Sequence, residues 1–181
     1  MKSGLKYVTF ETDMGWVGIL GSARGLCHTT LPQRSAKEAR QLLSIKDAAW
    51  SPHLFEDLVP RFCTYFNGRK VAFPDILDIS EATLFQRRVW EVTRLIPYGN
   101  TRSYLWVAEQ IGKPTAARAV GQALARNPLP IIVPCHRVLS SNGKLGGFSD
   151  GLEMKRSLLS LEAAGSPQPP EATSSPLSPA P

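Results

Sequence analysis

The sequence predicts an α+β protein, in which a small N-terminal α/β domain is followed by a C-terminal winged helix-turn-helix domain. Three observations support this prediction. Strand-like and helical segments alternate in the first 78 residues. Two short helical segments joined by a Gly-containing turn follow within residues 103–127, and an Asn-Gly pair then marks a hairpin turn. The predicted units are residues 1–78, 79–165 and a tail of residues 166–181.

The N-terminal unit contains two strand patterns, at residues 6–11 and 15–21, and two helical patterns, at residues 35–43 and 53–66. Turn-forming Gly, Pro and Asp residues separate them. The segment FPDILDI, residues 73–79, has no clear period. It is therefore expected to connect the two domains.

The C-terminal unit begins with a well-marked helix. Thr83 and Gln86 form a capping box, and an apolar helical face then continues until Pro97. Ser103 can cap a second helix, which is expected to end at Gly112. These signals predict two helices connected by a short turn.

A third helix, a wing and a last helix complete the predicted order. Pro114 and Thr115 open the third helix, and the segment SSNGK supplies the turn of a wing-like ribbon. Asp150 and Glu153 suggest a second capping box before the last helix. The inward face of that helix is expected to carry Met154, Leu158 and Leu161.

Composition and charge restrict the function. The tail holds six prolines and almost no large apolar side chains, which predicts disorder. Residues 79–165 carry 11 Lys and Arg against 6 Asp and Glu, and a basic domain of this kind attracts phosphate backbones. Three widely spaced cysteines and the lack of a long apolar run predict free thiols, no membrane contact and an intracellular protein.

Cys135 stands in IIVPCHRVL, residues 131–139. The apolar run predicts a short strand or extended segment that enters the core, and Pro134 fixes the backbone before the cysteine. A nucleophilic thiol needs a nearby base or positive charge, for which His136 and Arg137 are candidates. Neighbouring side chains of an extended segment point to opposite faces, so His136 is expected to act through a water. A buried structural thiol is the alternative.

Two further charged residues stand in unusual places. Glu162 lies among leucines near the end of the last helix, where a buried carboxylate would need a partner such as a catalytic histidine. The alternative is a solvated glutamate at a helix end.

Arg118 stands among small residues on the third helix, so its side chain is expected to project outward to phosphate or solvent. A sharper hypothesis is insertion of Arg118 into a base stack.

The string AARAVGQALARNPLPIIVPCHRVLSSNGKLGGFSDGL, residues 116–152, closely resembles the O6-alkylguanine-DNA alkyltransferases, also called methylated-DNA-protein-cysteine methyltransferases. PCHRV is similar to their active-site motif, and the ARAVG and GG-F-x-x-GL elements stand in the same order and spacing. The similarity covers residues 80–165. Residues 1–78 match in general layout, and FETDMGWVGILGSARGL resembles the family's first hairpin, so the resemblance implies a ribonuclease-H-like N-terminal domain.

The resemblance implies a repair protein that moves a methyl or other alkyl group from guanine O6, and also from thymine O4, to its own cysteine in one irreversible turnover. Cys135 would take the alkyl group, with His136 as water-mediated base and Glu162 as the partner that orients it. Tyr104 would donate a proton or hydrogen bond to the leaving base. Asn127 would tie the recognition helix to the cysteine loop.

The family also implies a mode of DNA binding. A monomer would dock its helix-turn-helix in the minor groove of double-stranded DNA, unlike most such motifs, and would flip the damaged base out because O6 lies inside the duplex. Arg118 would replace the flipped nucleotide, Ser149 would lie near O6, and the carbonyls of Cys135 and Val138 would read the guanine amine. The expected DNA- and base-binding residues are Thr115, Ala117, Arg118, Gly121, Arg137, Val138, Phe148 and Ser149.

The chain departs from the family pattern in the wing and in the first domain. Phe148 stands where some members have tyrosine, and Asp150 adds a charge where glycine is common. Some members bind zinc through two cysteines and two histidines of the first domain. Here the candidates do not reproduce that spacing, so neither a metal nor a cofactor is expected; they are Cys27, His28, His53 and Cys63.

Three other functions are compatible with parts of the sequence. Lesion-binding relatives without transfer activity carry tryptophan in place of the cysteine, whereas this chain has Cys135. A helix-turn-helix regulator would be expected to have a dimerisation helix or an effector domain, and neither is apparent. A cysteine hydrolase could use Cys135, His136 and Glu162, but no oxyanion-hole motif stands out.

Overall fold

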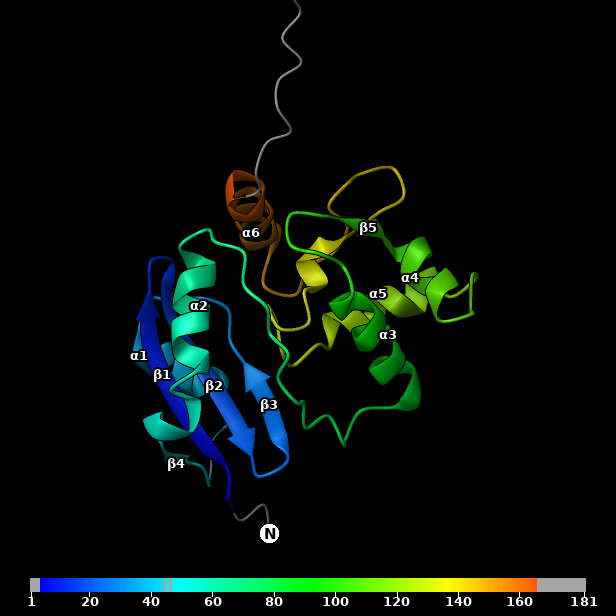
Figure 1. Ribbon diagram of the computed structural model, residues 1–181. Helices are drawn as coiled ribbons and strands as arrows, with labels where there is room; N and C mark the ends of the chain where they lie inside the picture. Colours follow the sequence, from blue (N-terminus) through cyan, green and yellow to red (C-terminus); the bar gives the residue numbers. More distant parts are fainter. Residues whose placement is uncertain (1–3, 44, 46, 166–181) are drawn as a thin grey trace, which may run out of the picture.

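The computed structural model describes residues 4–43, 45 and 47–165, and it shows a mixed α/β protein with six α-helices (Figure 1). The predicted tail, residues 166–181, lies outside the described residues. Strands β1 (Lys6–Thr12), β2 (Gly15–Ser22), β3 (Gly25–Thr29) and β4 (Ala49–Trp50) form one sheet in the order β3-β2-β1-β4. Strands β1 and β2 are antiparallel, whereas β4 runs parallel to β1.

Different helices cover the two faces of this sheet. Side chains alternate between the faces of a strand, so Val17 and Ile19 point to one side and Gly18 and Leu20 to the other. Helix α2 (Leu58–Phe66) packs with Val17 and Ile19 in the main core and crosses the sheet in Figure 1. Helix α1 (Ala36–Leu42) lies so close to the opposite face that a Cβ at Gly18 would be 2.9 Å from Leu43.

The predicted helix at residues 53–66 is wrong in its extent. The chain forms a 3-10 turn, η1 (Pro52–Phe55), and α2 begins only at Leu58. Pro60 explains the break, because proline has no N–H to donate to the carbonyl four residues earlier. Proline is therefore tolerated only in the first turn of a helix, which is the place that Pro60 occupies in α2.

The first two helices of the second half begin where the sequence predicts, whereas the third begins at Ala117 and not at Pro114 and Thr115. Thr83 and Gln86 make both hydrogen bonds of the capping box at the start of α3 (Leu84–Arg94). Ser103 Oγ accepts from the Trp106 N–H at the start of α4 (Tyr104–Gln110), and α5 (Ala117–Ala125) follows after a turn that contains Gly112 at φ 73°. A short parallel pair, β5 (Arg102–Ser103) and β6 (Val138–Leu139), lies beside them.

The last helix, α6 (Leu152–Gly165), has different terminal contacts from those expected. Instead of the suggested box, Asp150 accepts from Ser149 Oγ at 3.2 Å, and Glu153 pairs with Arg156. Leu158 is fully buried, while Met154 and Leu161 are partly buried against the core. The expected inward face of α6 is thus confirmed.

The loop of residues 140–150, where a wing-like ribbon is expected, forms its turn without strands in the described part of the chain. The Ser140 N–H donates to the Lys144 carbonyl and the Gly143 N–H to the Ser140 carbonyl, both at 2.9 Å, but residues 140–150 contain no strand. In a β-ribbon, the carbonyls of one strand accept from the backbone N–H groups of the other. Here the carbonyls of Leu145 and Gly147 accept from the Lys155 ammonium, at 2.5 Å and 3.4 Å.

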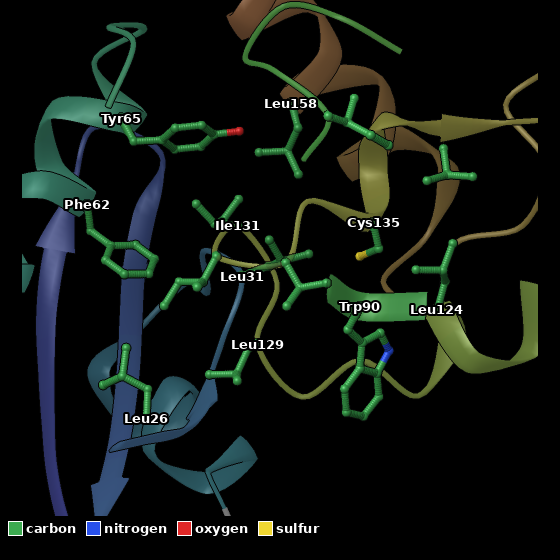
Figure 2. Close-up of a cluster of buried hydrophobic side chains, with 14 of the residues drawn as sticks. Leu26, Leu31, Phe62, Tyr65, Trp90, Leu124, Leu129, Ile131, Cys135 and Leu158 are labelled. Atoms are coloured by element: carbon green, nitrogen blue, oxygen red, sulfur yellow. The ribbon is translucent and has the colours of Figure 1, made fainter. Parts of the chain in front are cut away.

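One hydrophobic core runs through both halves of the chain. Figure 2 shows Phe62 of α2 on one side and Trp90 of α3 and Cys135 on the other, with Leu129 and Ile131 between them. The cysteine loop is therefore the segment through which the two halves pack. Across residues 4–43, 45 and 47–165, no helix has the length and apolar character needed to cross a bilayer.

Candidate active site

The loop before Cys135 is held by hydrogen bonds from both halves of the chain. Thr29, at the end of β3, donates its N–H to the Pro128 carbonyl at 2.9 Å and its hydroxyl to the Pro130 carbonyl at 2.8 Å. The Asn127 amide donates to the Val133 carbonyl at 2.9 Å and accepts from the Leu129 N–H at the same distance. These bonds fix the path of residues 128–133.

The expectation of a short strand or extended segment at residues 131–133 is wrong, because residues 131 and 132 form a turn. Ile131 has φ 75°, a left-handed conformation that a β-branched residue adopts only under strain of about 1–3 kcal/mol. The Val133 N–H turns back to the Leu129 carbonyl at 2.8 Å, and Cys135 begins a 3-10 turn, η2 (Cys135–Arg137). A tight loop whose conformation is imposed by its surroundings therefore presents the cysteine.

The Cys135 thiol lies at the inner wall of a pocket. Its residue exposure is only 8%, and burial raises the pKa of the thiol. Two neighbours oppose this shift and favour the thiolate. The Asn127 amide lies 3.3 Å from Sγ, and the Lys155 ammonium adds a positive charge nearby.

His136 has one ring nitrogen engaged and one without a hydrogen-bond partner among the described residues. Its Nε2 lies 2.7 Å from Glu162 Oε1, and its Nδ1 is buried. An ionised carboxylate only accepts hydrogen bonds, so Nε2 carries the proton and Nδ1 keeps a lone pair. Burial lowers the pKa of His136, although Glu162 opposes the shift. The imidazole is therefore a neutral base at neutral pH.

Glu162 is buried, which rules out the alternative of a solvated helix end. Its carboxylate accepts from His136 Nε2, the Tyr65 hydroxyl, the Arg137 guanidinium and, at 3.0 Å, the Gly99 N–H. Burial alone would raise the pKa of Glu162, but the hydrogen bonds from His136 and Arg137 and the charge of the Arg137 guanidinium hold it well below its usual range. The carboxylate therefore stays ionised.

The expectation that Arg137 binds DNA or assists the thiol is wrong. Its side chain is 10% exposed, and its guanidinium donates to Glu162 at 2.9 Å and to the Ile96 carbonyl at 2.7 Å. Burying a guanidinium without a carboxylate partner is expensive. The side chain consequently turns to Glu162 and not toward a DNA-facing surface.

Seven of the predicted residues line one pocket of about 670 Å³ between α4, α5 and the loop of residues 140–150, a volume typical of ligand sites. They are Tyr104, Ala117, Arg118, Gly121, Cys135, Phe148 and Ser149. The Tyr104 hydroxyl donates to the Gly147 carbonyl at 3.3 Å. Arg118 is exposed at the pocket, as its small neighbours predict.

Thr115 and Val138 do not line this pocket in the described structure. Thr115 is exposed in the turn before α5, whereas Val138 is buried. The Val138 carbonyl accepts from the Lys155 ammonium at 2.7 Å. A carbonyl has two lone pairs, so it retains one for a further donor.

Sequence reasoning missed Lys155 and Tyr65. Lys155 is fully buried, lies 5.7 Å from the Tyr104 ring centre and 5.8 Å from that of Phe148, and burial lowers its pKa to about 8. Lys155, Leu158 and Glu162 are three and four residues apart, so they lie on one face of α6. Since Leu158 is predicted to face inward, this spacing could have identified Lys155 as buried. Tyr65 gave no such signal, because it continues the apolar face of α2.

The candidate zinc residues do not assemble. Within the described ranges, no group of three or more His, Cys, Asp and Glu side chains could hold a metal ion. Cys27 Sγ lies 3.8 Å from Asp78, and Cys63 Sγ lies 3.8 Å from the Glu11 carbonyl.

The site can be compared with known proteins. Residues 84–164 match the DNA-binding domain of 6-O-methylguanine DNA methyltransferase. The methylated-DNA-protein-cysteine methyltransferase of Mycolicibacterium paratuberculosis is 39% identical over 165 residues, which are 90% of this chain and 95% of the relative. The chain belongs to this methyltransferase family. The relative from Methanosarcina acetivorans, with the same family name, is also 39% identical, over 87% of this chain and 98% of its own.

Solved structures of methyltransferases have the same fold. The Mycobacterium tuberculosis OGT in complex with DNA is 40% identical, has a TM-score of 0.76, and is matched over 90% of this chain and 96% of its own. The O6-methylguanine-DNA methyltransferase of Pyrococcus kodakaraensis is 26% identical with a TM-score of 0.61, over 87% of this chain and 98% of its own. This methyltransferase is a DNA-repair protein that transfers an alkyl group to cysteine.

Proposed function

We propose that this methyltransferase takes the alkyl group from O6-alkylguanine, and also from O4-alkylthymine, onto Cys135 in a single irreversible turnover. One observation carries the proposal: Cys135 belongs both to the pocket and to the segment of the buried His136–Glu162 pair. A free thiol is a weak nucleophile until it loses its proton. The neutral His136 Nδ1 accepts that proton through a bridging water.

The transfer is a displacement at carbon. The Cys135 thiolate forms the S–C bond as the C–O6 bond breaks, and the electron pair leaves with the purine. Tyr104, in the same pocket, stabilises the leaving base by donating a proton or hydrogen bond to its ring. Asn127 stabilises the thiolate by its amide and ties the end of α5 to the cysteine loop.

The substrate is double-stranded DNA, bound by a monomer. Helices α4 and α5 form a helix-turn-helix, with the loop of residues 140–150 as its wing. The small residues Ala117 and Gly121 let α5 approach the minor groove closely. The damaged base is flipped into the pocket, and the exposed Arg118 fills its place in the stack. The strand order β3-β2-β1-β4 supports a ribonuclease-H-like layout for the first half.

Other pocket residues bind the flipped base. Phe148 stacks on it, Ser149 lies near O6, and the Cys135 and Val138 carbonyls accept from its amine. Thr115, exposed before α5, contacts the DNA beside the groove. The protein acts where genomic DNA is kept, in the cytoplasm or the nucleus.

Mass spectrometry of the full chain after incubation with duplex DNA containing O6-methylguanine tests the site of transfer. We expect one added methyl group, on the peptide that contains Cys135. Cys27 and Cys63 are internal controls, because both are more exposed than Cys135 and neither lines the pocket. A methyl group on either of them, or lesion binding without any mass change, would overturn the proposal.

The flipping role has its own test. Arg118→Ala should slow transfer from duplex DNA far more than transfer from free O6-benzylguanine, because only the duplex leaves a gap in a base stack. Gln122→Ala is a suitable control, since Gln122 is also exposed at the rim of the pocket on α5. Equal losses for the two substrates would remove the assignment of Arg118.

A further inference from the structure

The first half of the chain contributes a side chain to the buried pair behind the thiol. Tyr65, on α2, donates its hydroxyl to Glu162 Oε1 at 2.7 Å, and the same hydroxyl oxygen lies 3.2 Å from His136 Nε2. All three side chains are buried, with residue exposures of 0% or 1%. Tyr65 and Glu162 are 97 residues apart in the sequence. We propose that Tyr65 is a positioning residue for alkyl transfer, which sets the orientation and proton affinity of the His136–Glu162 pair.

The direction of the hydrogen bonds follows from the chemistry of the three groups. His136 Nε2 carries the proton that binds Glu162, so it cannot accept from Tyr65. The Tyr65 hydroxyl must therefore donate to Glu162. Burial, and next the negative charge of Glu162, raise the pKa of Tyr65 well above its usual value, so it remains a donor throughout the neutral range.

A shared acceptor links Tyr65 to the base. Oε1 of Glu162 accepts from Tyr65 and His136, each at 2.7 Å, and also from Arg137 Nη2 at 2.9 Å, while Oε2 accepts from Arg137 Nε at 2.9 Å and from the Gly99 N–H. A donor on Oε1 withdraws negative charge from the atom that faces the imidazole. Burial lowers the pKa of His136. We infer that Tyr65 acts in the same direction, because it limits how strongly Glu162 stabilises the imidazolium.

Packing alone does not explain a tyrosine at this place. Phe62 and Phe66, on the same helix, fill the core on either side without a polar atom, and the Tyr65 ring makes edge contacts with Phe66, Phe73 and Tyr98. A buried hydroxyl is costly unless it is hydrogen-bonded. The bond to Glu162 supplies the compensation, and it places the hydroxyl beside the proposed base.

Tyr98 provides a matched control. It is buried, its ring centre lies 5.9 Å from that of Tyr65, and its hydroxyl has no hydrogen-bond partner among the described residues. Tyr65→Phe and Tyr98→Phe thus each remove one oxygen from neighbouring buried rings. Only the first substitution removes a bond to the His136–Glu162 pair.

The test measures single-turnover transfer from O6-methylguanine duplex DNA against pH, with lesion binding and thermal unfolding measured on the same proteins. In Tyr65→Phe we expect the acid limb of the profile to move to higher pH, because Glu162 then holds the imidazolium more strongly. The plateau rate constant should fall by roughly tenfold through lost orientation. Lesion binding should not change, and Tyr98→Phe should keep the parental profile. An unmoved limb in Tyr65→Phe, or the same movement in both variants, would overturn the inference.

The inference rests on the proposed role of His136 as base, and two further variants separate the two. His136→Asn and Glu162→Gln should both abolish the parental acid limb. If they alter the profile while Tyr65→Phe does not, only the role of Tyr65 fails. If neither alters it, the proposed base itself is wrong.

Discussion

Glu162→Gln is the substitution whose effect on stability follows most directly from the structure. The change keeps the shape of the side chain but removes its charge, and it leaves the buried Arg137 guanidinium without a counter-ion. The side chains of Glu162 and Arg137 are 1% and 10% exposed, so water cannot solvate the unpaired guanidinium. Removing one member of a buried ion pair costs about 3–5 kcal/mol. In a chain of this length that corresponds to a fall in Tm of roughly 6–20 °C.

Glu153→Gln is the matched control, because the same change on the same helix breaks an ion pair with Arg156 at the surface. The Glu153 side chain is 90% exposed, and exposed pairs contribute about 0–1 kcal/mol. Denaturant unfolding of both variants measures the difference. If Glu162→Gln were no more destabilising than Glu153→Gln, the carboxylate would not hold Arg137 as described.

The pH dependence provides an independent check on the same residue. The pKa of Glu162 lies below its ordinary 4.5 in the folded chain, so this carboxylate stabilises the fold at neutral pH. The stabilisation is lost as the pH falls from about 4.5 toward the depressed value, since the unfolded chain then binds the proton first. The gap in unfolding free energy between the parent and Glu162→Gln should therefore narrow in acid. A gap that stayed constant down to pH 3 would contradict the pairing.

Three further predictions concern the pocket. Asn127→Ala should slow transfer about tenfold in single-turnover assays, because the thiolate loses the amide 3.3 Å from Sγ and the pKa of Cys135 rises; an unchanged rate would refute this. Gly146→Ala should be more harmful than Gly143→Ala in thermal unfolding and in transfer, since both glycines have φ near 70–80° but only at Gly146 would a Cβ meet Tyr104, at 2.9 Å. The transfer rate should be flat near neutral pH and fall only below 6.5, because burial lowers the pKa of His136; a fall that began above pH 7 would count against a neutral His136.

Local signals predicted the starts of α3 and α4 well, because each start depends on neighbouring residues. The capping box of Thr83 and the cap of Ser103 are made within four residues along the chain, so the sequence contains both partners. The turn at Gly143 is equally local. Pro60 is an equally local signal, because its missing N–H places it in the first turn of a helix and not in the interior of one that spans residues 53–66.

The buried charges could be anticipated only in part. Glu162 was recognised as unusual because it stood among leucines, but nothing in the sequence located Tyr65, 97 residues earlier, against it. The sequence alone does not show that Arg137 is buried against Glu162, because a basic residue beside a reactive cysteine can bind DNA or a carboxylate. The left-handed Ile131 had no sequence signal at all, because its conformation is imposed by Thr29, Asn127 and the core around it.

The pair of hydrogen bonds from Thr29 to the Pro128 and Pro130 carbonyls has a consequence for chimaeric proteins. A C-terminal half grafted onto a foreign N-terminal partner would need an N–H and a hydroxyl at the same place, or the segment preceding the thiol would lose its anchorage. Exchange of halves between relatives should therefore succeed only when the donor strand carries threonine or serine there.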